Sequence, residues 1–69
     1  MKQLSGKQFA KLVELHGWNL LRVKGSHHIY GNAGSTVRLS IPLHRNQPLK
    51  RGLLAHLAKL AGLKESDLE

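Results

Sequence analysis

The chain has 69 residues, 41% of them hydrophobic, and its 11 Lys and Arg against four Asp and Glu give a formal charge of +7. A chain this short buries only about 60% of the surface that it exposes when unfolded, so we expect one small domain with a thin core. The hydrophobic content is too high for a disordered chain, and no apolar run approaches the roughly 20 residues that a membrane span requires.

A helix is predicted over residues 5–16. Ser5 can cap its first turn, and Gln8 three positions later completes a capping box. Apolar residues then recur at helical spacing, and Gly17 is placed to end the helix in the left-handed conformation. The apolar stripe consists of Phe9, Leu12 and Val13, with His16 at its end.

Three strands are predicted over residues 18–24, 27–31 and 35–41. The Gly25-Ser26 pair between the first two fits a two-residue hairpin turn, because Gly supplies the positive φ that such turns need. Pro42 is expected to end the ladder of the third strand, because proline has no N–H group. In that strand Val37, Leu39 and Ile41 would face the core, and Thr36, Arg38 and Ser40 would face water.

The hairpin turn determines which residues of the first two strands face each other. The expected cross-strand pairs are Lys24 with His27, Val23 with His28, Arg22 with Ile29 and Leu21 with Tyr30. Because successive side chains of a strand point to opposite faces, His27 and His28 should not act on the same atom. We expect His27 to face outward beside Lys24, and His28 to share the other face with Tyr30.

A second helix is predicted over residues 49–61, followed by a frayed tail at 62–69. Its inward stripe would be Leu49, Leu53, Leu57 and Leu60, widened by Leu54 and Ala61, and Gly62 would end it. The order helix, three antiparallel strands, helix predicts an α+β domain. Both helices should cover one face of the sheet and leave the other face open.

Two cations, Lys50 and Arg51, fall in the first turn of this second helix, where the helix dipole disfavours positive charge. Their position suggests a phosphate that binds there together with free N–H groups. The alternative is that both are ordinary solvated side chains. The positive charge of the whole chain favours a polyanionic partner, nucleic acid before an acidic protein or an anionic membrane surface.

Several motifs follow one another in a distinctive order: a helix that ends at Gly17-Trp18, the segment Gly25-Ser26-His27-His28, and a strand that closes on Pro42 with His44 two residues later. In this order the chain resembles, over nearly all of its length, the HicA family of bacterial toxin–antitoxin ribonucleases. The resemblance implies a double-stranded-RNA-binding-like fold, metal-independent cleavage of mRNA, and neutralisation by a HicB antitoxin. It also implies that the catalytic histidine, the first after Gly-Ser, is His27.

RNA carries its own nucleophile, the 2′-OH beside each phosphate, so a small ribonuclease needs a base and cations around the phosphate. Free histidine has a pKa of about 6.5, which suits a base near neutral pH. We therefore expect His27 to act as the general base, with no metal or cofactor. The expected RNA-binding residues are Arg22, Lys24, Gly25, Ser26, Lys50 and Arg51, and the auxiliary candidates are His28, Tyr30, which could stack on a base, and His44.

Other interpretations remain open from the sequence. His27 could be an ordinary solvated histidine of the turn, without a catalytic role. The whole chain could be a non-catalytic module that binds duplex RNA by its shape. A zinc site of His27, His28 and His44 is disfavoured, because the chain has no cysteine and this region has no carboxylate. A membrane-active amphipathic peptide is opposed by the hairpin and the two capped helices. The lack of cysteine and of an apolar leader leads us to expect the cytoplasm.

Overall fold

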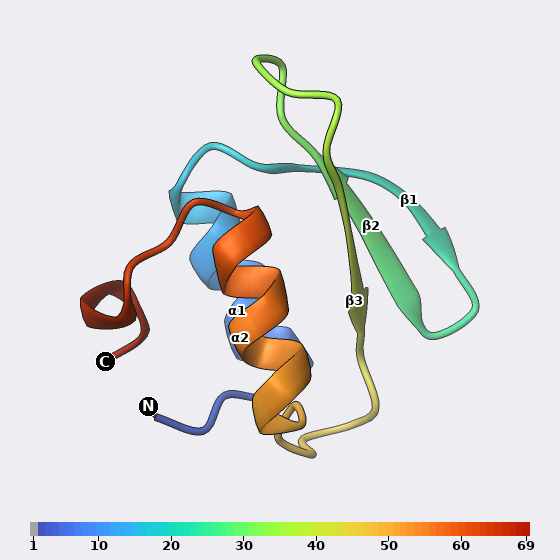
Figure 1. Ribbon diagram of the computed structural model, residues 1–69. Coiled ribbons are helices and arrows are strands. Elements are labelled where there is room, and N and C mark those ends of the chain that lie inside the picture. The colour runs from blue at the N-terminus through green and yellow to red at the C-terminus, as the bar shows by residue number, and fades with distance from the viewer. Residues whose placement is uncertain (1) are drawn as a thin grey trace.

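The computed structural model describes residues 2–69. In chain order it contains α1 (Gly6–Leu15), β1 (Asn19–Lys24), β2 (His27–Gly31), β3 (Arg38–Pro42), α2 (Arg51–Leu60) and a short 3₁₀ helix, η1 (Glu65–Leu68). The strands form one antiparallel sheet in the order β1-β2-β3. Both α-helices lie on the same side of this sheet, as Figure 1 shows. The predicted α+β order with an open second sheet face is therefore confirmed.

The predicted capping of α1 is present. The Gln8 N–H donates to the Ser5 hydroxyl at 3.1 Å, and the Ser5 N–H donates to the Gln8 side-chain carbonyl at 2.9 Å. Gly17 has a φ of +92°, and the Trp18 N–H donates to the carbonyl of Val13 at 3.0 Å. Local sequence alone therefore determines where this helix begins and ends.

The core lies between the two helices and the sheet. Its buried apolar members are Leu4, Phe9, Ala10, Val13, Trp18, Tyr30, Leu39, Ile41, Leu49, Leu54, Leu57, Ala58 and Leu68. The stripe predicted for α2 is partly wrong, because Leu60 is 38% exposed and Leu53 is only half-buried. The buried side of α2 is instead formed by Leu54, Leu57 and Ala58. Within residues 2–69 no helix has the length and apolar character needed to cross a membrane.

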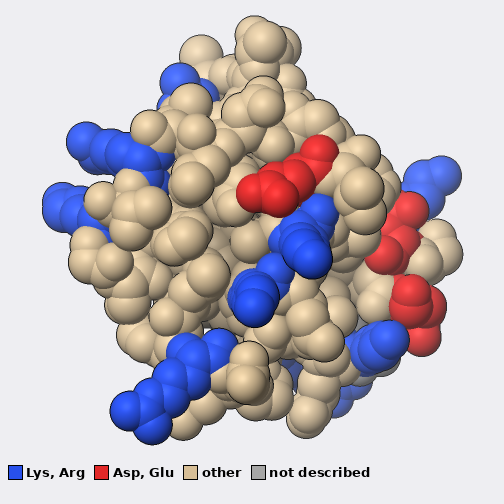
Figure 2. Space-filling model, turned by 180° about the vertical axis from the view of Figure 1, so that it is seen from behind, with Lys and Arg blue, Asp and Glu red and all other residues tan. Residues whose placement is uncertain are grey.

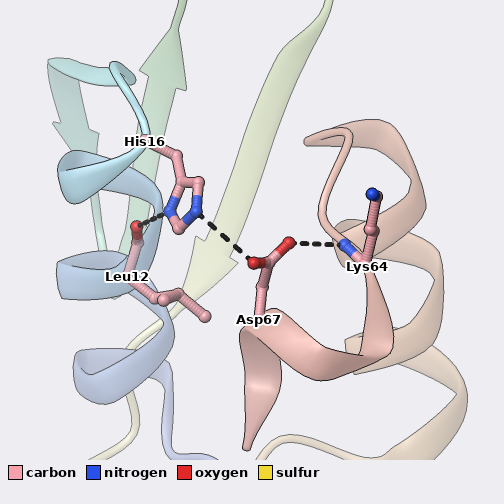
Figure 3. Close-up of polar contacts among 4 residues, drawn as sticks. All are labelled: Leu12, His16, Lys64 and Asp67. Carbon is pink, nitrogen blue, oxygen red and sulfur yellow. Dashed lines mark hydrogen bonds and ion pairs between the residues drawn. The ribbon is translucent and has the colours of Figure 1, made fainter.

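The tail was expected to be frayed, and this expectation is wrong. Leu68 is only 3% exposed within the core. The Lys64 N–H donates to one oxygen of Asp67 at 2.8 Å, and the other oxygen lies 3.9 Å from Nε2 of His16 on α1, as Figure 3 shows. Nδ1 of His16 in turn donates to the carbonyl of Leu12 at 3.0 Å. A buried leucine and these polar contacts hold the tail against α1.

The sheet follows the predicted hairpin register near the turn and departs from it further away. Gly25 has a φ of +60°, and the turn pairs Lys24 with His27 and Val23 with His28 as expected. A bulge at Leu21 then places Leu20, not Leu21, opposite Tyr30. A bulge adds one residue to one strand, so every pair beyond it shifts by one.

The third strand is displaced relative to the predicted range of 35–41. It begins at Arg38 because the preceding residues form turns, in which the Ser35 N–H donates to the carbonyl of Asn32 at 3.0 Å and the Val37 N–H donates to the Ser35 hydroxyl at 2.9 Å. Pro42 is the last residue of the strand, opposite His27, so the strand ends at the proline as expected. The next residue, Leu43, donates its N–H to the carbonyl of Ser26 at 2.8 Å. This hydrogen bond does not require an N–H group on Pro42.

Candidate active site

His27 is the first residue of β2, directly after the hairpin turn, and its side chain is exposed. It lies opposite Lys24 on β1 and Pro42 on β3. His28, the next residue, is half-buried and lies opposite Ile41 of the core. Alternation along the strand therefore separates the two histidines, with His27 on the open face and His28 on the face toward the helices.

The ring of His27 is oriented by a serine of the neighbouring strand. Its Nδ1 lies 3.2 Å from the hydroxyl of Ser40. Ser40 is paired with Ile29, so it sits diagonally from His27 on the same open face. When Nδ1 carries the proton and donates to this hydroxyl, Nε2 keeps its lone pair and can accept a proton.

His44 lies beside His27, although 17 positions separate them in the chain. The two ring centroids are 6.2 Å apart and the rings are perpendicular. The hydrogen bond from Leu43 to Ser26 brings the start of the 43–50 loop next to the hairpin turn. At the other end of this loop the Leu49 N–H donates to the carbonyl of Leu4 at 2.7 Å. Backbone hydrogen bonds therefore hold both ends of the loop that carries His44.

The two histidines open onto a hollow of about 360 Å³ between the end of β3 and the start of α2. The residues that line it are His27, Pro42, His44, Gln47, Pro48, Leu49, Lys50 and Leu53. Three of its polar groups, the two imidazoles and the ammonium of Lys50, are proton donors or acceptors suited to a phosphate group.

Some of the cations predicted to bind RNA lie near this site, and one of them, Arg51, lies elsewhere. Lys24 and Arg22 are exposed on the same sheet face as His27, and Lys50 lines the hollow. Lys50 occupies the N-cap position of α2, and its side chain makes no capping hydrogen bond. Arg51 lines a different hollow of about 170 Å³, together with Lys2 and Gln3. The set of six predicted RNA-binding residues is therefore not one cluster around His27.

Charge is unevenly distributed over the surface. In Figure 2 basic side chains lie on the side of the β1–β2 hairpin of Figure 1, in the middle and beside the C-terminal tail, whereas the acidic side chains of this view lie in the middle and toward the tail. The tail contains three of the four acidic residues, Glu65, Asp67 and Glu69. The hairpin side therefore presents a positive potential that attracts polyanions.

Tyr30 cannot stack on a base, contrary to the expectation, because its side chain is only 2% exposed. Its hydroxyl donates to a carboxylate oxygen of Glu14 on α1 at 2.7 Å. Burial, and secondarily the hydrogen bond and charge of Glu14, raise the pKa of Tyr30 to about 12. Tyr30 thus joins the sheet to α1.

Sequence reasoning missed Ser40 and Gln47 as members of the site. Ser40 was expected only to face water, and its approach to His27 depends on the pairing between β2 and β3. That pairing depends on the conformation of residues 32–37, of which 35–37 were expected to belong to the strand but precede it. In the part of the chain that the structure describes, no group of three or more His, Cys, Asp or Glu side chains is placed to hold a metal ion.

A family model described as HicA toxin of bacterial toxin-antitoxin matches residues 6–63, which include both helices, the sheet and the loop with His44. No curated protein is found to be similar to the chain. The match spans most of the chain and includes the hairpin and the hollow. The chain therefore belongs to the HicA toxin family of bacterial toxin–antitoxin systems.

Proposed function

We propose that this toxin is an endoribonuclease that cleaves mRNA without a metal ion, and that His27 is its general base. The observation that carries this proposal is the arrangement of His27. The imidazole is exposed, its Nδ1 contacts the Ser40 hydroxyl at 3.2 Å, and it shares a hollow with Lys50.

In this mechanism Nε2 of His27 takes the proton of a 2′-OH, and the resulting oxygen attacks the adjacent phosphorus. The bond from phosphorus to the 5′ oxygen breaks and leaves a 2′,3′-cyclic phosphate. Lys24 and Lys50 lie close enough to His27 in the fold to hold phosphate oxygens, and Arg22 extends the same face along β1. Arg51, in its separate hollow, would contact a neighbouring phosphate of the same strand.

The first experiment is cleavage of single-stranded RNA in excess chelator by the wild-type protein and by His27→Ala. Loss of a general base typically lowers the rate by about 10²–10⁴-fold, so His27→Ala should be nearly inactive. His56→Ala is the matched control, because His56 is an exposed histidine of α2 that does not line the hollow. DNA of the same sequence should bind but stay intact, since it lacks the 2′-OH.

Two results would refute this mechanism: cleavage of DNA by the pure protein, or undiminished RNA cleavage by His27→Ala. If neither protein cleaves but both bind RNA equally, a non-catalytic RNA-binding module is the better account. The basic hairpin side is the observation that favours this second candidate.

The proposal extends to a HicB-type antitoxin that neutralises the toxin. We expect an acidic surface of that partner to cover the face with His27 and Lys24, because opposite charge speeds capture and blocks phosphate access. Histidine acylation followed by mass spectrometry checks this, and His27 should be protected in the complex. An equally reactive His27 in the inhibited complex would refute it.

A further inference from the structure

We infer that His44 is the general acid of the cleavage reaction, so that His27 and His44 form an acid–base pair across one phosphodiester. This inference rests on the proposed ribonuclease function. It assigns the step that His27 alone leaves open, the protonation of the departing 5′ oxygen.

The geometry of the two rings supports the pair. Their centroids are 6.2 Å apart, the rings are perpendicular, and both line the same hollow. A general base and a general acid that serve one phosphorus atom must each come within about 3 Å of their own oxygen, one on the attacking side and one on the leaving side. The rings form an edge-to-face pair with no space for a phosphate between them, so the phosphodiester would lie across both rings in the hollow that they share.

His28, the other nearby histidine, cannot take this role. It is half-buried and lies opposite Val23 and Ile41, on the side of the sheet that faces the helices. His44 instead follows β3 on an exposed loop. Lys50 in the same hollow is a cation that can hold a non-bridging phosphate oxygen, which leaves the imidazolium of His44 to donate the proton.

The loop also holds His44 in a defined position. Its ends are fixed by the hydrogen bonds from Leu43 to Ser26 and from Leu49 to Leu4, and the Gln47 N–H donates to the carbonyl of His44 at 3.1 Å. Arg45 inside this turn has a φ of +56°, a conformation that non-glycine residues adopt at a cost. A catalytic side chain must be held in place in this way before substrate binds.

The complete step balances as follows. The 2′-OH proton moves to Nε2 of His27, the 2′ oxygen bonds to phosphorus, and the bond between phosphorus and the 5′ oxygen breaks. The imidazolium of His44 gives its proton to that 5′ oxygen. The products are a 2′,3′-cyclic phosphate and a 5′-OH, and the two histidines have exchanged protonation states.

A substrate with a better leaving group isolates the role of the acid. RNA in which the bridging 5′ oxygen of the scissile bond is replaced by sulfur releases a thiolate, which needs no protonation because thiols are much stronger acids than alcohols. His44→Ala should therefore cleave ordinary RNA about 10²–10⁴-fold more slowly than the wild type, yet cleave the sulfur-substituted RNA within about tenfold of it. His27→Ala should be slow on both substrates, and His56→Ala should match the wild type on both.

Three outcomes would overturn the inference. If His44→Ala cleaves ordinary RNA at the wild-type rate, His44 has no catalytic part, and the role of His27 stands. If His44→Ala is equally slow on both substrates, its role is binding or positioning. If the wild type cleaves neither substrate, the ribonuclease function fails and the pair fails with it. A second variant, His44→Gln, together with thermal unfolding and RNA-affinity measurements on both variants, separates these outcomes from a folding defect. Because the side chain of His44 is exposed, both variants should fold.

Discussion

At the scale of single residues, the site uses side chains whose partners come from other strands and loops. His27 depends on Ser40 for its orientation, and Tyr30 depends on Glu14 for its hydrogen bond. Tyr30 was predicted from the sequence to assist at the site, but its role is structural. Its ring is in the core and its hydroxyl reaches the carboxylate of α1, so it determines how the sheet packs on the helix.

Tyr30→Phe should lower the free energy of unfolding by about 1 kcal/mol at neutral pH, because it removes one hydrogen bond to a carboxylate. The wild type should lose more stability than this variant as the pH rises. The pKa of Tyr30 is raised to about 12 in the folded protein, so between pH 10 and 12 the unfolded chain ionises its tyrosine while the folded chain does not. The expected additional loss is about 2 to 3 kcal/mol across that window.

Urea unfolding of both proteins at several pH values between 8 and 12 measures this difference. Lysine ionisation affects both proteins equally, so it cancels in the comparison. Parallel pH profiles for Tyr30→Phe and the wild type would contradict the burial of a neutral Tyr30.

At the scale of elements, the first turn of α1 supports the loop with His44. Gly6 is buried against the end of β3, and a Cβ at this position would collide with the carbonyl of Pro42 and approach Leu43. Leu43 is the residue that joins the loop to the hairpin turn. The close approach of α1 to β3 therefore helps to hold His44 near His27.

Gly6→Ala should destabilise the protein by about 1 to 3 kcal/mol, because the backbone of β3 must move to admit the methyl group. Gly52→Ala is a matched comparison with the opposite sign. Gly52 also lies in the first turn of a helix, but a Cβ there meets no atom within 4 Å. Alanine should therefore stabilise α2 by about 0.5 to 1 kcal/mol.

Chemical denaturation of the two variants measures both effects. In addition, Gly6→Ala should reduce RNA cleavage at temperatures where it remains folded, since the loop with His44 would shift. Equal stability of the two variants would show that α1 does not pack on Pro42 as described.

Across the whole molecule, the acidic side chains are concentrated away from the hairpin. Three of the four acidic residues belong to the tail, and the tail packs on α1 away from the hairpin. Under the proposed function, the basic hairpin side would attract RNA, or an acidic antitoxin, without competition from the acidic residues of the tail.

RNA binding should weaken with salt according to the number of phosphates that are contacted, with a slope of about −0.7 per contact for a single strand. Lys50 and Lys59 test which cations take part, because they flank the two ends of α2 and only Lys50 lines the hollow. Lys50→Ala should reduce the slope of log K against log salt by about 0.7, and Lys59→Ala should leave it unchanged. Titrations at several salt concentrations measure both slopes, and equal slopes for the two variants would place the RNA elsewhere.

Sequence alone was enough to predict the features that depend on a few neighbouring residues. The Ser5–Gln8 capping box, the glycine ends of both helices and the pairing of Lys24 with His27 all follow from groups within about six positions of each other. The α+β order and the exposure of His27 on the open face follow from these local signals, because strand alternation needs only the turn to set its phase.

The groups that meet His27 from distant parts of the chain could be identified only from the packing of the folded chain. Ser40 and His44 reach it through the β2–β3 register and the 43–50 loop, Arg51 turns to a separate hollow, and the tail folds back to bury Leu68. These positions depend on contacts between segments that are far apart in the chain. They cannot be predicted from the residues of any one segment. The local pattern thus located the histidine, and the packing of β3, its loop and α1 supplied its neighbours.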